Sequence, residues 1–302
     1  MRFKGLDLNL LVALEALLAE RNVTAAARKV FISQSAMSGA LARLRTYFQD
    51  ELLVPLGRKL VLTAAAEDLA GPLRQLMLQI ESTVGAGIRF DPATSQRSFV
   101  LHASDYTTEV VLTRVTRRLA RQAPGVVLDI VPPIDDPATT LETGEVDLVI
   151  TPEAYVSRAH PAELLFEERH VVVGWRGNKQ LKAPLTARLF FELGHVVVRF
   201  TRNRQAAFAE SEIARKNRSR RVELVAPSFT SVPKLLVGTA RVAVMHRRLA
   251  QIYARTLPLV LLPLPFEMPP LREMIQHHQV RATDTGVRWL KAQIKAVARE
   301  LD

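Results

Sequence analysis

One stretch of this chain, from Asn22 to Phe48, constrains its fold more than any other. It is predicted to form two short helices joined by a tight turn. Thr24 and Ser33 stand where N-caps are preferred, so we expect the two helices to begin there. The apolar residues of the second helix recur at spacings of four, three and four, the period of one buried helix face: Met37, Leu41, Leu44 and Phe48.

The opposite face of the second helix carries small uncharged hydrogen-bonding groups followed by a base, namely Gln34, Ser35, Ser38, Ala42 and Arg45. An ordinary exposed helix face would be rich in Glu and Lys instead. Short donors and acceptors at a helix N-terminus suit an element that enters the major groove of DNA. The pattern therefore predicts a helix-turn-helix with a recognition helix beginning near Gln34. An amphipathic hairpin of some all-α domain is the alternative that the local pattern leaves open.

The segment after this motif predicts a small β-hairpin, because two short extended runs flank Gly57-Arg58-Lys59. Arg58 and Lys59 at its tip are placed to contact phosphates or the minor groove. The formal net charge of +11 favours a polyanionic partner. Residues 1–63 are therefore predicted to form a winged helix-turn-helix DNA-binding domain.

A long helix is predicted next, within a linker of residues 64–90. Its apolar residues lie close to a heptad seam: Leu69, Leu73, Leu76, Ile80 and Val84. An exposed apolar seam on a lone helix is costly, so we expect it to pair with a second copy of the chain. Packing of the same seam on the C-terminal domain is the alternative.

Strands and helices alternate beyond residue 97, which predicts parallel βαβ units in an effector-binding domain of residues 91–302. We expect lobe I at about 91–167 and 271–302, lobe II at about 168–270, and a cleft between them. Ligands of open α/β folds bind beyond the carboxyl ends of strands. The residues expected there are Ser104, Asp105, Tyr106, Thr107, Thr151, Pro152, Phe200, Thr201 and His277, with Phe229, Ser231 and Val244 as neighbours.

The aromatic and hydroxyl groups of this set fit a small aromatic acid or phenol better than a sugar. The Tyr106 hydroxyl is expected to bond the ligand, and the helix start at Ser104–Thr107 to offer it backbone amides. Cysteine is absent, and the histidines lack ligand-like spacing, so neither a metal nor a cofactor is expected. With no G-x-S-x-G and no P-loop, we expect no enzyme. With no apolar run approaching ~18 residues, we expect a cytoplasmic protein without a membrane partner.

These motifs resemble those of LysR-type transcriptional regulators over essentially the whole chain. The segment DLNLLVALEALLAERNVTAAARKVFISQSAMSGALARLRTYFQDELL is similar to that family's winged helix-turn-helix. The segments MRFKGLDLNLLVALEAL, DPATSQRSF, LETGEVDLVI and VRWLKAQI are most similar to its NodD-like, aromatic-responsive branch. The resemblance implies a C-terminal fold like that of periplasmic binding proteins. It also implies a homodimer or homotetramer that binds promoter DNA and is switched by a small molecule, with RNA polymerase as a candidate partner.

By this resemblance, Gln34, Ser35 and Ser38 are expected to contact bases, and Arg43 and Arg45 the DNA backbone. Relatives usually carry a wing arginine where this chain has Pro55 and Leu56. Either Arg58 and Lys59 replace that contact or the wing binds more weakly. We expect an activator of a catabolic or symbiosis-type operon. The rival interpretation is a cytoplasmic solute-binding or sensor protein, which would have no need for the first 63 residues.

Overall fold

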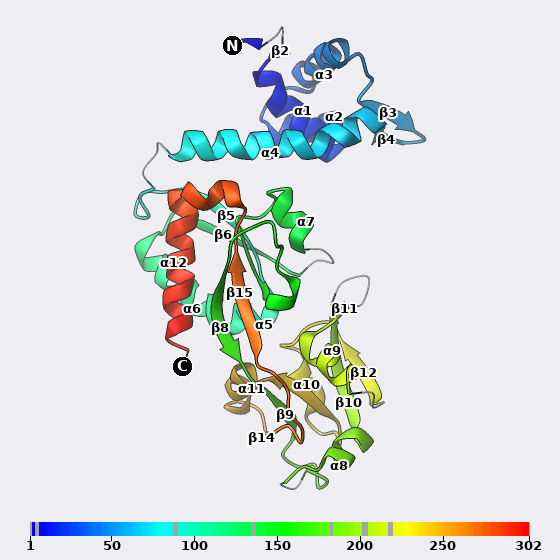
Figure 1. Ribbon diagram of the computed structural model, residues 1–302, viewed down its shortest axis with the longest axis vertical. Coiled ribbons are helices and arrows are strands. Elements are labelled where there is room, and N and C mark those ends of the chain that lie inside the picture. The colour runs from blue at the N-terminus through cyan, green and yellow to red at the C-terminus, as the bar shows by residue number, and fades with distance from the viewer. Residues whose placement is uncertain are drawn as a thin grey trace. The chain divides into compact units, whose positions relative to one another are not determined.

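The computed structural model describes residues 2–3, 6–86, 90–133, 137–181, 184–200, 205–216 and 220–301. The chain divides into two compact units (Figure 1). The first comprises Met1–Ile88 with Glu142–Gly144, and the second comprises Arg89–Leu141 with Glu145–Asp302. Each unit has a hydrophobic core, so each is described by itself.

The first unit is a bundle of helices with a two-stranded wing. Its elements are β1 (Arg2–Phe3), β2 (Leu6–Asp7), α1 (Asn9–Glu20), α2 (Val23–Lys29), α3 (Gln34–Phe48), β3 (Leu53–Leu56), β4 (Lys59–Leu62) and α4 (Ala64–Ala86). The predicted stripe of α3 is buried at Met37, Leu41 and Leu44 and partly buried at Phe48. Strands β3 and β4 pair antiparallel around Gly57, whose φ of 63° suits the tight turn.

The two predicted helix caps have different outcomes. Ser33 caps α3 as predicted, because its hydroxyl accepts from the Ala36 N–H at 3.1 Å. Thr24 is not a cap. Asn22 takes that role, accepting from the Ala25 N–H at 2.9 Å, so α2 begins one residue before Thr24. Asparagine is as good an N-cap as serine or threonine, and the earlier residue prevails here.

The predicted apolar seam of α4 is partly buried and partly exposed to solvent. Leu69 and Leu73 pack in the core of the first unit. Leu76 and Ile80 remain exposed, at 47% and 41% of their surface, and the Val84 side chain lies outside the described residues. The apolar face left for a partner is therefore shorter than the heptad pattern predicts.

The second unit contains two sheets. The first has the strand order β6-β5-β7-β15-β8, with β5, β6 and β7 parallel and β15 antiparallel to both β7 and β8. Its strands are β5 (Ser98–His102), β6 (Val127–Val131), β7 (Leu148–Pro152), β8 (Ala162–Glu168) and β15 (Leu271–Gln276). One face packs against α6 (Thr113–Gln122) and α12 (Thr285–Arg299), and the other packs against α7 (Pro137–Glu142) (Figure 1). The late strand β15 thus returns to the first lobe, as predicted.

The second sheet follows the order β11-β10-β13-β9-β14, with β12 also paired to β10. Its strands are β9 (His170–Trp175), β10 (Gly194–Phe200), β11 (Gln205–Ala206), β12 (Arg221–Ala226), β13 (Val242–His246) and β14 (Leu259–Leu262). The helices around it are α8 (Ala187–Glu192), α9 (Phe208–Ala214), α10 (Val232–Leu236) and α11 (Arg247–Ala254). One hydrophobic core runs through both lobes.

Some elements differ from the prediction. The helical segment that follows β5 is not one continuous α-helix but consists of α5 (Asp105–Thr107), a π-helical turn over Thr108–Leu112, and α6. Such π-turns are frequent at functional sites. Both sheets are mixed rather than purely parallel, and β14, α8 and α11 were not predicted. Among the described residues, no helix combines the length and apolarity needed to cross a membrane.

Candidate functional site

The exposed face of α3 is a row of small polar groups. Gln34, Ser35 and Ser38 are all exposed, and the Ser33 and Ser35 hydroxyls lie 2.9 Å apart. A Cβ added at Gly39 would meet no neighbouring atom within 4 Å. Glycine in a helix interior costs roughly 1 kcal/mol relative to alanine, and packing within the chain gives no reason for it. This face therefore has room for another molecule to approach closely.

The wing tip provides two exposed cations next to this helix in the sequence. Arg58 and Lys59 form no ion pair with any described residue of the first unit. Arg43 is also exposed but lies 3.2 Å from Asp7. The three cations are thus available to an anionic partner. Arg43 would first have to give up its ion pair with Asp7, which is a surface pair and therefore weak.

Arg45 does not face outward as predicted. Its guanidinium donates to the main-chain oxygens of Glu51 and Leu53, each at 2.9 Å, and lies 3.1 Å from the Glu51 carboxylate. The prediction of a DNA-backbone contact is therefore corrected, because Arg45 joins α3 to the start of the wing. Fixed in this way, it orients the wing rather than presenting its charge.

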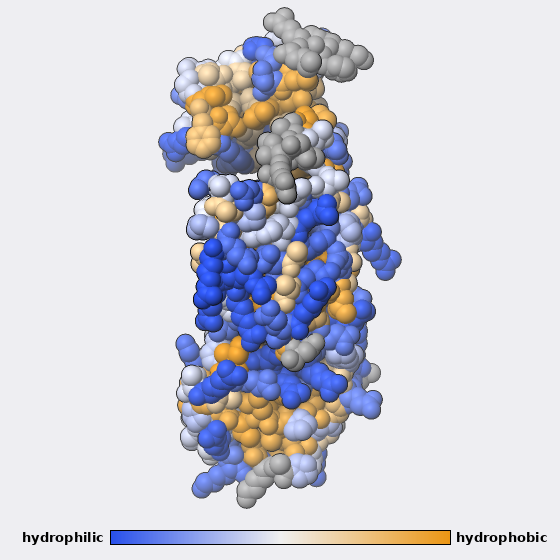
Figure 2. All heavy atoms as spheres, turned by 90° about the vertical axis from the view of Figure 1, so that its left-hand side faces the viewer, coloured by the Kyte–Doolittle hydropathy of each residue, from blue (hydrophilic) through white to orange (hydrophobic). Residues whose placement is uncertain are grey.

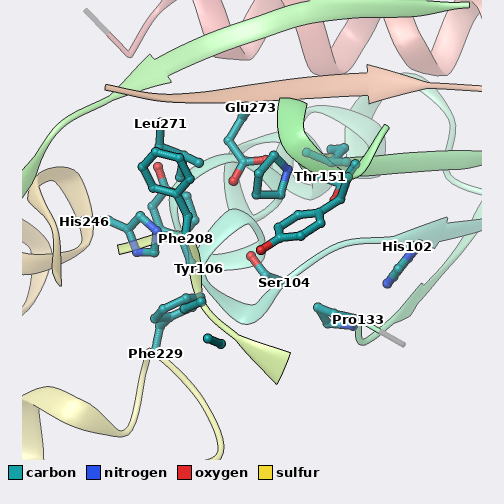
Figure 3. A pocket seen from close by; sticks show the side chains of 15 residues that line it. His102, Ser104, Tyr106, Pro133, Thr151, Phe208, Phe229, His246, Leu271 and Glu273 are labelled. Carbon is teal, nitrogen blue, oxygen red and sulfur yellow. The ribbon is translucent and has the colours of Figure 1, made fainter. Parts of the chain in front are cut away.

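A cavity lies between the two lobes of the second unit (Figure 3). Lobe I contributes the carboxyl ends of β5 and β7 together with β15, and lobe II contributes the segment 206–208, Phe229 and His246. The predicted residues that line it are Ser104, Tyr106, Thr151, Pro152 and Phe229. Its volume is about 80 Å³, below the roughly 300–1,000 Å³ of typical ligand pockets. A ligand larger than one ring therefore requires side chains or lobes to move.

Tyr106 is the centre of a buried network beside this cavity. Its hydroxyl donates to Glu168 Oε2 at 2.7 Å, and its ring stacks on His246 with the centroids 3.7 Å apart. Burial and the Glu168 charge raise the pKa of Tyr106, so it remains a donor. Because its proton is engaged by Glu168, the Tyr106 hydroxyl can only accept a hydrogen bond from a ligand in this state, and that expected bond stays a prediction. The Thr107 amide is also engaged, by the Ser104 hydroxyl at 3.1 Å.

Glu273 is the acidic group that lines the cavity. It is 3% exposed, and its Oε2 has no hydrogen-bond partner among the described residues. Burial, and then repulsion from Glu168, raise the pKa of Glu273 to about 8. Burial lowers the pKa of His102 to about 4 and also lowers that of His246. The described lining residues include neither lysine nor arginine, so at neutral pH the cavity wall is almost uncharged.

The other predicted effector residues lie elsewhere. The Asp105 carboxylate binds the Thr230 amide and hydroxyl at 2.7 and 2.8 Å, joining the lobes. The Ser231 hydroxyl donates to the Ser228 main-chain oxygen, and Thr107 is not among the lining residues. Val244 borders a smaller neighbouring cavity, and His277 lines a surface groove with Lys291. The Phe200 side chain and Thr201 lie outside the described residues.

Several lining residues were not predicted: His102, Pro133, Ile150, Tyr155, Ala206, Ala207, Phe208, His246, Leu271 and Glu273. Glu273 had a usable signal, since it alternates with the apolar Leu271 and Ile275 on one face of its strand, where an acid is unusual. His246 ends β13, so the strand-end rule applied to every strand would have included it. The others come from segments that only the folded chain brings together.

Comparison with known proteins agrees with this architecture. The model described as bacterial regulatory helix-turn-helix protein, lysR family, matches residues 8–67, and the one described as LysR substrate binding domain matches residues 93–299. Nodulation protein D from Bradyrhizobium sp. (strain ANU 289) is 44% identical over 291 residues, which cover 96% of this chain and 86% of that protein.

Solved structures contain the same fold. A probable transcriptional regulator from Pseudomonas aeruginosa is 31% identical, with a TM-score of 0.69 and coverage of 97% of both chains. A full-length OxyR variant from the same organism shares the fold, with a TM-score of 0.77 at 15% identity and coverage of 98% of both chains. A helix-turn-helix unit joined to a two-lobed unit with an internal cavity defines a ligand-responsive DNA-binding protein. The chain belongs to the LysR family of transcriptional regulators.

Proposed function

We propose that this regulator reads its promoter with the exposed face of α3 and is switched by a small, uncharged aromatic molecule in the interlobe cavity. The observation that carries the DNA part is the row of Gln34, Ser35 and Ser38 beside Gly39, with no neighbouring atom against the glycine. Uncharged donors and acceptors on an open helix face match the hydrogen-bonding edges of bases in the major groove. Arg43, Arg58 and Lys59 supply cations for phosphates.

Gln34→Ala tests the base-reading part. The variant is expected to lose about 1–3 kcal/mol of discrimination between the preferred duplex and a random one, because the amide is a bidentate group for a base edge. Arg58→Ala is the matched control, and it should weaken both duplexes alike and reduce the salt slope by about one. Both measurements use fluorescence anisotropy on the full chain. Equal losses for both variants on both duplexes would contradict this division of roles.

The effector class follows from the charge of the cavity wall. Aromatic rings of Tyr106, Phe208 and Phe229 and the hydroxyls of Ser104 and Thr151 surround the space (Figure 3). A carboxylate ligand would meet no cation among the described lining residues and would lie near Glu273 and Glu168. Rings favour an aromatic ligand, and protonated Glu273 can donate to a carbonyl or phenol oxygen. Of the two expected classes, the phenols are therefore favoured over the aromatic acids.

Thermal shifts of the full chain test this effector class. Neutral phenols and flavonoids are compared with benzoate and salicylate at equal concentrations. A ligand at one hundred times its Kd should add about 2.7 kcal/mol to stability, which raises the Tm by several degrees. Phe208→Ala should abolish the shift, whereas His277→Gln, outside the cavity, should keep it. A shift with benzoate alone would contradict the uncharged class.

The remaining roles rest on similarity to relatives and on α4. The relatives named nodulation protein D favour a symbiosis-type operon, and we place this chain as its activator, acting in the cytoplasm with RNA polymerase as a partner. The exposed Leu76 and Ile80 of α4 support pairing with a second copy. Sedimentation equilibrium of the full chain distinguishes a homodimer from a homotetramer.

A further inference from the structure

The turn between α2 and α3 carries an unusual residue, Phe31. The Phe31 and Ile32 amides donate to the main-chain oxygens of Arg28 and Ala27, at 3.2 and 3.0 Å, in the manner of a Schellman cap at the end of α2. This cap requires a left-handed backbone at Phe31, where φ is 57°. Glycine normally fills the position and asparagine sometimes does, whereas a bulky side chain there is a genuine outlier.

The aromatic ring is not needed for packing either. Phe31 is 95% exposed. The described chain has three other non-glycine residues with positive φ, and each has a local explanation: Arg21 and Gln49 are polar caps at helix ends, and Leu52 is buried in the core. Phe31 is therefore unfavourable both in backbone conformation and in hydration. Neither cost is compensated by a contact with the described residues, which points to a contact with another molecule.

The position of Phe31 identifies that molecule. It stands two residues before Ser33, the N-cap of α3, and next in sequence to the exposed groups Gln34 and Ser35. The N-terminus of a recognition helix is the part that enters the major groove. The one apolar group on the edges of bases in that groove is the 5-methyl of thymine.

We propose that Phe31 reads a thymine by packing its ring on the 5-methyl group, beside the bases contacted by Gln34 and Ser35. This inference rests on the proposed reading of DNA by α3. It makes Phe31 a specificity-determining residue for a thymine at one position of the promoter site. The left-handed turn holds the ring outside the protein core, where DNA bound by α3 can cover it.

Phe31→Asn tests the contact without threatening the fold, because asparagine tolerates the left-handed backbone better than phenylalanine does. The full-length variant should melt no lower than the wild type. Its affinity for the duplex that the wild type selects from a random pool should fall about five- to tenfold, while its affinity for a random duplex stays unchanged. Val127→Asn, an exposed apolar residue of β6, is the matched control and should bind both duplexes as the wild type does.

Deoxyuracil scanning of the selected duplex then locates the methyl group. Replacing one particular thymine with deoxyuracil should weaken wild-type binding about fourfold, the value of one apolar carbon. The same replacement should leave the affinity of Phe31→Asn unchanged. Three results would overturn the proposal: wild-type affinity of Phe31→Asn, equal loss on both duplexes, or the same deoxyuracil penalties for variant and wild type. Gln34→Ala distinguishes failure of this inference from failure of the proposed function. Unchanged selectivity in Gln34→Ala would contradict the reading of bases by α3 itself.

Discussion

Replacing Glu273 with glutamine is expected to stabilise the second unit by about 3–5 kcal/mol at pH 8 and hardly at all near pH 4.5. Burial, and then the Glu168 charge, raise the pKa of Glu273 from 4.5 to about 8. Between these values the folded chain holds a proton that the unfolded chain has released. Wild-type stability therefore falls as the pH rises through this window, and glutamine, which cannot ionise, removes the fall.

Urea unfolding at both pH values measures this difference. Tryptophan fluorescence reports the second unit alone, because Trp175 and Trp289 are the two tryptophans of the chain and both lie in that unit. Glu167→Gln is the matched control, since Glu167 is an exposed neighbour on β8 and should change stability by less than about 0.5 kcal/mol. The same gain for Glu273→Gln at pH 8 and pH 4.5 would contradict a buried proton on Glu273.

The protonated state of Glu273 also bears on the effector. A neutral carboxyl can donate a hydrogen bond into the cavity, whereas an ionised one only accepts. Glu168 on β8 repels the Glu273 charge, and the Tyr106 hydroxyl belongs to the same network, while burial keeps the His102 and His246 imidazoles of the cavity wall neutral. Ligands that accept a hydrogen bond are therefore favoured below about pH 8, which agrees with the proposed uncharged class.

Replacing Arg97 with methionine is expected to destabilise the second unit by about 3–5 kcal/mol, because it leaves the partly buried Asp284 carboxylate without its hydrogen-bonded cation, whereas Asp147 keeps its ion pair with Arg281. The Arg97 guanidinium donates to both Asp284 oxygens, at 2.7 and 2.8 Å, and to Asp147 at 3.4 Å. Asp284 in turn caps α12 by accepting from the Gly286 and Val287 amides. The substitution therefore weakens contacts at the start of β5, at the start of β7 and at the start of the C-terminal helix α12.

The same unfolding experiment at pH 7 measures this effect. Arg118→Met is the matched control, since its pair with Glu300 is more exposed and should contribute no more than about 1 kcal/mol. Burial alone would raise the pKa of Asp284, but Arg97 and the Val287 amide outweigh it and lower that pKa. The wild-type contribution is thus present above about pH 3.8 and is lost as the pH falls through the lowered pKa. Equal losses for Arg97→Met and Arg118→Met would contradict the network.

The local elements of the first unit could be predicted from the sequence because their signals are local. The four–three–four stripe of α3, the Ser33 cap and the Gly57 turn depend on residues within a few positions of one another. Thr24 shows the limit of such signals, since two acceptable caps stood close together and the structure uses Asn22. The seam of α4 shows another limit, because periodicity cannot tell that Leu73 is buried within its own unit while Ile80 is not.

Only part of each candidate site could be predicted from the sequence. The rule of strand ends identified the cavity-lining Ser104 and Thr151, because it needs only the order of elements, while the base contacts of Gln34 and Ser38 stay predictions. Arg45 was misassigned, since its partners lie in the wing and charge alone does not reveal which oxygens a guanidinium will meet. His277 was misplaced because β15 runs antiparallel to β7, so its carboxyl end lies at the opposite edge of the sheet from the carboxyl ends of β5 and β7.

The sequence by itself determined the periodic helices, the alternation of strands and helices, and the two-part organisation of this regulator, because each is set by neighbours along the chain. Only the tertiary structure decided that Tyr106 bonds Glu168, that Glu273 carries a buried proton, and that an almost uncharged wall lines the cavity. Those properties depend on burial and on distances between residues far apart in the sequence. They arise only when the two lobes close around the same space.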